Sequence, residues 1–124
     1  MVDKKILIVD DEEDFGRMLK LNLEKTGRYI VRLETKGKKA LQSAQMFRPD
    51  LVILDVMMPD LMGNKVAEQI KADNEFSRVP IIFLTAVVKE GEVEEREGKI
   101  SGYPCLAKPI NIEKLIEAIE YNTY

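Results

Sequence analysis

Four short apolar runs in the chain each end at a polar residue. The runs cover residues 5–9, 51–54, 81–84 and 106–107. The residues that follow them are Asp10 with Asp11, then Asp55, Thr85 and Lys108. In an open sheet of parallel strands the carboxyl ends share one edge, and ligands bind in the crevice there. We therefore predict that three carboxylates, one hydroxyl and one ammonium meet in one place.

The spacing of these residues agrees with a parallel sheet. Forty-five residues separate Asp10 from Asp55, thirty separate Asp55 from Thr85, and twenty-three separate Thr85 from Lys108. Each interval is long enough for a crossover helix between two parallel strands. A further strand is predicted over 29–33, and apolar residues at helical spacing follow the strands. We expect alternating strands and helices, five of each, with helices on both faces of the sheet.

The predicted helices have recognisable stripes and ends. The first stripe is followed by Gly27 as a stop signal, and the second ends before Pro49. Asn111 is expected to cap the last helix. The apolar stripes comprise Phe15, Met18, Leu19 and Leu23; Ala40, Leu41 and Ala44; Val66, Ala67 and Ile70; and Ile112, Leu115, Ile116 and Ile119.

Four strings together resemble the motif set of response-regulator receiver domains. They are Ile8-Val9-Asp10-Asp11, Asp55-Val56-Met57-Met58-Pro59-Asp60 with Gly63, Leu84-Thr85-Ala86, and Lys108-Pro109. The resemblance runs from about residue 4 to the last helix. It implies an α/β fold of the (βα)5 flavodoxin-like type, doubly wound around a five-stranded parallel sheet in the order 2-1-3-4-5. We expect one receiver domain over residues 1–124.

Three carboxylates held close together repel one another, which raises at least one pKa. A divalent cation would offset this charge, and Mg²⁺ suits carboxylate and phosphate oxygens. By the resemblance, Asp11 and Asp55 ligate Mg²⁺ directly, Asp10 acts through water, and the backbone carbonyl of Met57 supplies another oxygen. Taken alone, Asp10 and Asp11 could equally serve the N-terminus of a helix.

Asp55 is the candidate nucleophile, because a carboxylate can attack a phosphoryl group and form an aspartyl-phosphate. Thr85 would donate its hydroxyl to that group, and Lys108 would place an ammonium on its oxygens. Taken one at a time, these residues also have purely structural explanations. Asp55 could make a turn, Thr85 could be a β-branched residue at a strand end, and Lys108 could be a surface lysine. In the family the bond before the proline at position 109 is commonly cis.

The resemblance implies a switch in two-component signalling and not an enzyme with an external substrate. Asp55 would take a phosphoryl group from a histidine of a sensor histidine kinase or a histidine phosphotransfer protein. The changed surface would then control a downstream protein or an output domain. The chain has no histidine, so it is not itself a histidine phosphotransfer module.

Composition limits the partners and the compartment. The formal net charge is −3 with no basic stripe in the sequence, so nucleic-acid binding is not expected. The single cysteine, Cys105, fits a reducing compartment. The first apolar run is too short for a signal peptide or a membrane span, so we expect a cytoplasmic protein.

Three other readings use parts of the same pattern. A haloacid-dehalogenase-like phosphatase would need a general acid two residues after the nucleophile, where this chain has Met57. A flavodoxin-type binder would need a phosphate-cradling loop after the first strand, where acidic residues follow Asp10. A receiver that only docks, without phosphorylation, would not need all five site residues.

Two features depart from the family. Receivers usually have Tyr or Phe three residues before the lysine, and this chain has Cys105 there, with Tyr103 on the same face if the strand is regular despite Pro104. The segment over 89–99 contains two glycines and little apolar surface, so we expect its helix to be short or mobile.

Overall fold

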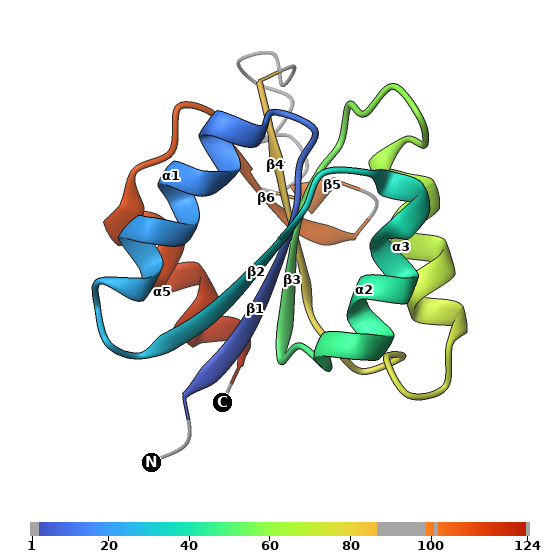
Figure 1. Cartoon of the computed structure of the whole chain (residues 1–124), viewed down its shortest axis with the longest axis horizontal. Helices are drawn as coiled ribbons and strands as arrows, with labels where there is room; N and C mark the ends of the chain where they lie inside the picture. Colours follow the sequence, from blue (N-terminus) through green and yellow to red (C-terminus); the bar gives the residue numbers. More distant parts are fainter. Residues whose placement is uncertain (1–2, 87–98, 101, 124) are drawn as a thin grey trace.

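The computed structural model describes residues 3–86, 99–100 and 102–123 (Figure 1). Its strands are β1 Lys4–Val9, β2 Tyr29–Glu34, β3 Leu51–Asp55, β4 Ile81–Thr85, β5 Lys99–Ile100 and β6 Tyr103–Ala107. Its helices are α1 Glu13–Glu24, α2 Ala40–Phe47, α3 Gly63–Ala72 and α5 Ile112–Asn122, with a 3-10 turn, η1, over Gly37–Lys39. Within these residues, no helix is long and apolar enough to cross a membrane.

The sheet has the strand order β2-β1-β3-β4-β6-β5. The first five strands in this order pair in parallel, with β6 in the place of the predicted fifth strand. The predicted order 2-1-3-4-5 is therefore confirmed. The short strand β5 was not predicted; it pairs antiparallel with β6 and forms the edge of the sheet.

Helices cover both faces of the sheet, with α1 and α5 on one side and α2 and α3 on the other (Figure 1). Alternate residues of β1 supply the two cores: Leu7 and Val9 belong to the core beneath α2 and α3, and Ile6 and Ile8 to the core beneath α1 and α5. Because the central strands are buried on both faces, they appear in the sequence as continuous apolar runs.

The predicted helix ends agree with the structure. After α1 the chain turns at Gly27, which has φ +75°. Helix α2 ends at Phe47, and its cap residue Arg48 has the left-handed conformation just before Pro49. The side chain of Asn111 accepts hydrogen bonds from the N–H groups of Glu113 and Lys114, so it caps α5 as predicted.

A short or mobile helix was predicted over 89–99. Residues 89–98 of this segment lie outside the described part of the chain. At its end, Lys99 forms the strand β5 with Ile100 and is not helical. The predicted face of Tyr103 is confirmed: Tyr103 and Cys105 both contact the core beneath α2 and α3, although Pro104 lies between them. The ring of Tyr103 packs edge-on against Phe83, 5.6 Å between centroids.

The amino end of the sheet is tied to the end of α5. Glu120 accepts a hydrogen bond from the hydroxyl of Tyr29 at 2.6 Å and forms an ion pair with Lys4 at 3.1 Å. The start of β1 and the end of α5 therefore lie side by side, at the end of the sheet opposite the carboxyl ends of its parallel strands (Figure 1).

Candidate functional site

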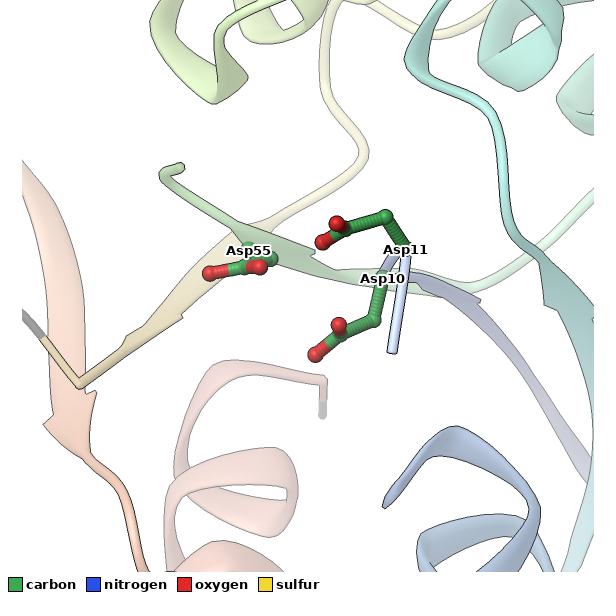
Figure 2. A group of neighbouring side chains, drawn as sticks. All are labelled: Asp10, Asp11 and Asp55. Carbon is green, nitrogen blue, oxygen red and sulfur yellow. The ribbon is translucent and has the colours of Figure 1, made fainter. Parts of the chain in front are cut away.

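Three aspartates gather at the carboxyl edge of the sheet. Asp10 and Asp11 follow β1, Asp55 is the last residue of the neighbouring strand β3, and their three side chains are grouped at these strand ends (Figure 2). One oxygen atom of each carboxylate lies within 4.8 Å of the others. Asp10 and Asp55 are buried, whereas Asp11 is exposed. The cluster is therefore partly enclosed and open to solvent on the side of Asp11.

Lys108 brings a positive charge into this cluster from the end of β6. Its Nζ atom lies 2.8 Å from Oδ2 of Asp10, 2.9 Å from Oε1 of Glu12 and 3.7 Å from Oδ2 of Asp55. The ammonium also lies 4.4 Å from the centroid of the Phe15 ring. The peptide bond between Lys108 and Pro109 is cis, as the resemblance implies. The lysine side chain is 8% exposed, so its charge acts where water screens it little.

The environment of Asp55 favours its protonated form. Burial, followed by the negative charge of Asp10, raises the pKa of Asp55 to about 7, while Lys108 and hydrogen bonding from the backbone of Met57 act in the opposite direction. Burial lowers the pKa of Lys108, but its hydrogen bonds to Asp10 and Glu12 raise that pKa overall. The positive charge of Lys108 therefore does not fully offset the effects of burial and of Asp10, and further positive charge would favour the ionised form of Asp55.

Thr85 is the last residue of β4, beside β3, and is buried. Its backbone carbonyl accepts a hydrogen bond from the N–H of Lys108 at 3.0 Å, which joins the ends of β4 and β6. The ends of β1, β3, β4 and β6 therefore carry the predicted site residues to one edge of the sheet.

The loop after Asp55 passes close to the strand end. The N–H of Gly63 donates to the carbonyl of Val56 at 2.8 Å, and a Cβ atom at Gly63 would lie 2.3 Å from the carbonyl oxygen of Asp55. Met57 lies in this loop and is 48% exposed. The carboxylate of Asp60 accepts hydrogen bonds from the N–H groups of Gly37 and Lys38, which fastens the loop to η1.

The donor set suits a small, hard cation. Three carboxylates supply oxygen atoms from two neighbouring strand ends, and one of these residues faces solvent. Mg²⁺ is typically bound through one or two carboxylates and keeps several waters, which a partly open oxygen cluster permits. Asp10, Asp11 and Asp55 therefore fit this ion chemically.

Two neighbours of the lysine were not predicted. Glu12 pairs with Lys108 although its side chain is 62% exposed, and Phe15 contacts the ammonium with its ring face. Both lie just after the Asp10-Asp11 pair, at the beginning of α1. Their position could have indicated this contact, because residues that start the first helix border the carboxyl edge of the sheet.

Comparison with known proteins agrees with this fold. The model of the response regulator receiver domain family matches residues 6–120. The chain therefore belongs to the response regulator receiver domains of two-component signalling.

Individual relatives support the same assignment. The polar-differentiation response regulator DivK of Brucella anthropi is 32% identical over 118 residues, which is 94% of each chain. The chemotaxis protein CheY4 of Vibrio cholerae superposes with a TM-score of 0.84 at 30% identity, covering 98% of this chain and 99% of that one. The receiver domain of the sensor histidine kinase PA1611 of Pseudomonas aeruginosa superposes with a TM-score of 0.82 at 29% identity, covering 98% of each chain. That structure contains a magnesium ion coordinated in its active-site cleft.

Proposed function

We propose that Asp55 is the phosphoryl acceptor of a receiver domain that spans residues 1–124 and works in the cytoplasm. The observation that carries the proposal is the enclosed Asp55 carboxylate, which lies within 4.8 Å of two other carboxylates and 3.7 Å from the Lys108 ammonium. A buried carboxylate with nearby positive charge is suited to attack a phosphoryl group and to tolerate the charge that develops.

In the proposed reaction, a carboxylate oxygen of Asp55 attacks the phosphorus of a phosphohistidine on a partner protein. A bond forms between this oxygen and phosphorus, the bond between phosphorus and the imidazole nitrogen breaks, and its electron pair stays with the imidazole. Lys108 moves from its carboxylate partners toward the oxygens of the transferred group, and the hydroxyl of Thr85 donates to another. These contacts orient the group for transfer.

In this proposal Asp11, Asp55 and the backbone carbonyl of Met57 would hold Mg²⁺ directly, and Asp10 would hold it through a water molecule. When bound, Mg²⁺ would supply positive charge to the carboxylates and to the phosphoryl oxygens. Among this chain's own groups, Lys108 offsets the charge of Asp10 by direct contact at 2.8 Å. The phosphodonor would be a sensor histidine kinase or a histidine phosphotransfer protein, and the recipient of the signal a downstream protein or an output domain.

The proposed role is a switch without catalysis on an external substrate. Met57 supports this choice over a phosphatase, because its thioether cannot act as the general acid at that position. The enclosed Asp55 and its lysine neighbour support it over a receiver that only docks. The buried free thiol of Cys105 agrees with a reducing compartment.

The test uses acetyl phosphate as donor with Mg²⁺ and intact-protein mass spectrometry. The parent chain should gain the mass of one phosphoryl group, and Asp55→Asn should not, because an amide is a poor nucleophile. Asp14→Asn, which makes the same change at an exposed position on α1, should label like the parent. Equal labelling of Asp55→Asn and the parent would rule out this acceptor. Repeated turnover of p-nitrophenyl phosphate would favour a phosphatase.

A further inference from the structure

A groove of about 550 Å³ lies between α1 and the edge strand β2. Three cationic side chains line it: Arg17 and Lys20 from α1 and Arg32 from β2. The lining has one carboxylate, Glu13, which forms an ion pair with Arg17. The lining therefore carries a net positive charge, although the whole chain carries −3. A positively charged groove on a negatively charged protein favours the binding of an anionic partner.

The backbone of β2 also faces this groove. In a parallel pair of strands, the hydrogen-bonding groups of alternate residues point toward the partner. Arg28 and Glu34 accept from the N–H groups of Lys4 and Asp10, at 3.2 and 3.0 Å, so the even-numbered residues of β2 point toward β1. The odd-numbered Leu33 therefore points its N–H and carbonyl outward.

A second contact supports this direction. The N–H of Val31, also odd-numbered, donates to the side chain of Glu24 on α1 at 3.2 Å and thus points away from β1. Because β2 is the last strand at this end of the sheet, the outward groups of Leu33 border the groove. Glu24 occupies the donor at Val31, so a strand added at this edge could pair only from Leu33 toward Thr35.

We infer that this groove binds a short, extended, acidic segment of a partner protein, which adds to the sheet beside β2. The peptide backbone would pair with Leu33, while carboxylates along the segment would lie near Arg17, Lys20 and Arg32. The proposal does not require phosphorylation of Asp55.

Charge separates this occupant from two others. A second copy of the chain, paired through its own β2, would bring its own Arg32 and Arg17 to the same edge and add positive charge to a positive groove. A nucleic acid would meet a chain of net charge −3, in which these three cations form one small area. An acidic peptide satisfies both the cations and the outward backbone groups.

The probe is a synthetic peptide with alternating Glu and Thr or Val residues, added to ¹⁵N-labelled protein at low ionic strength. The amide signals of Leu33 and Thr35 should shift on titration. The double variant Arg17→Gln/Arg32→Gln should weaken binding by about fivefold or more, because it removes two partly exposed ion pairs. Arg28→Gln removes one positive charge at an exposed site outside the groove lining and should bind like the parent, whereas Arg32→Gln alone should weaken binding.

The role of the backbone has its own control, a peptide of the same sequence with N-methyl groups on the pairing edge. It should lose most of the affinity, because it cannot donate to the carbonyl of Leu33. Equal binding of the methylated peptide would overturn strand addition. The same shifts on raising the protein concentration without peptide would assign the groove to a second copy. Tighter binding of a short oligonucleotide than of the peptide would assign it to nucleic acid.

Discussion

The ammonium nitrogen of Lys108 lies 2.8 Å from Oδ2 of Asp10, and both side chains are almost completely enclosed. The lysine is thus held mainly by a neighbour of the proposed acceptor, since its distance to Asp55 is 3.7 Å. In the proposed reaction it must exchange partners when a phosphoryl group arrives. In the structure Lys108 therefore lies close to Asp55 but does not form a direct hydrogen bond with it.

Lys108→Met keeps much of the length of the side chain and removes its charge. Because Lys108 lowers the pKa of Asp55, the titration of Asp55 should move above about 7, as ¹³C NMR of the carboxyl would show. Labelling by acetyl phosphate should slow by roughly a hundredfold, the usual loss when one charge-stabilising donor is removed. Lys114→Met, at an exposed position on α5, should change neither property. An unchanged labelling rate in Lys108→Met would remove the lysine from the reaction.

Magnesium should stabilise the folded chain, because only folding brings the three carboxylates together. A ligand that binds only the native state adds about 2.7 kcal/mol at a hundredfold excess over its Kd. We expect the Tm to rise with millimolar Mg²⁺, and Asp11→Asn to reduce that rise sharply. Asp14→Asn, on the exposed side of α1, should leave it intact. A Tm of the parent chain that does not change with Mg²⁺ would contradict a metal site at these carboxylates.

The pKa of Asp55 predicts how stability depends on pH without divalent cations. Its folded pKa of about 7 lies above the ordinary value of 3.8, so the native state holds this proton more tightly than the unfolded chain. Stability should fall as pH rises from about 4 to about 7 and then level off. Asp55→Asn should lack this fall and be more stable at pH 8 by roughly 2–4 kcal/mol, since one pKa unit corresponds to about 1.4 kcal/mol.

Urea unfolding of both proteins at pH 4.5 and pH 8 would measure this difference. At pH 4.5 the difference should shrink to about 1 kcal/mol, because the carboxyl of Asp55 is protonated in the native state but mostly ionised in the unfolded chain. A constant offset between the proteins at both pH values would mean that packing, and not ionisation, separates them.

Gly63→Ala should distort the acceptor itself. Its Cβ atom would lie 2.3 Å from the carbonyl oxygen of Asp55 and 2.9 Å from Cα of Val56, and backbone cannot rotate away as a side chain can. We expect a loss of about 1–3 kcal/mol in urea unfolding and slower labelling of Asp55. Gly16→Ala is the matched control, because its close neighbour is the flexible end of Leu33. It should cost less and leave labelling unchanged; equal effects of the two variants would contradict this explanation.

Burial explains how much of this structure was predictable. Strands β1, β3 and β4 lie inside the sheet and are almost wholly apolar, so their lengths and their ends at Asp10, Asp55 and Thr85 follow from the sequence. Parallel pairing then brings those ends to one edge, which predicts the cluster of carboxylates. Lys108 follows β6, in which only Cys105 is buried, so its position was predicted from the short apolar run at 106–107 and the following proline.

The parts that were not predicted depend on contacts that have no periodic pattern. β5 has only two residues, one of them Lys99, and it exists by pairing with β6 at the sheet edge. The contacts of Lys108 with Glu12 and Phe15 depend on the reach of a long side chain. The groove along β2 brings Arg17 and Lys20 of α1 together with Arg32 of β2, and no run of the sequence contains all three cations.

The contact of Lys4 and Tyr29 with Glu120 has a practical consequence for handling this protein. It holds the start of β1 beside the end of α5, whereas Asp55 lies at the opposite end of the sheet (Figure 1). A biotin tag, a fluorophore or a sensor-chip surface attached next to either element would leave the carboxylates open to solution. Immobilised protein should therefore still accept small donors and peptides, which makes surface-based kinetics a suitable format for the assays above.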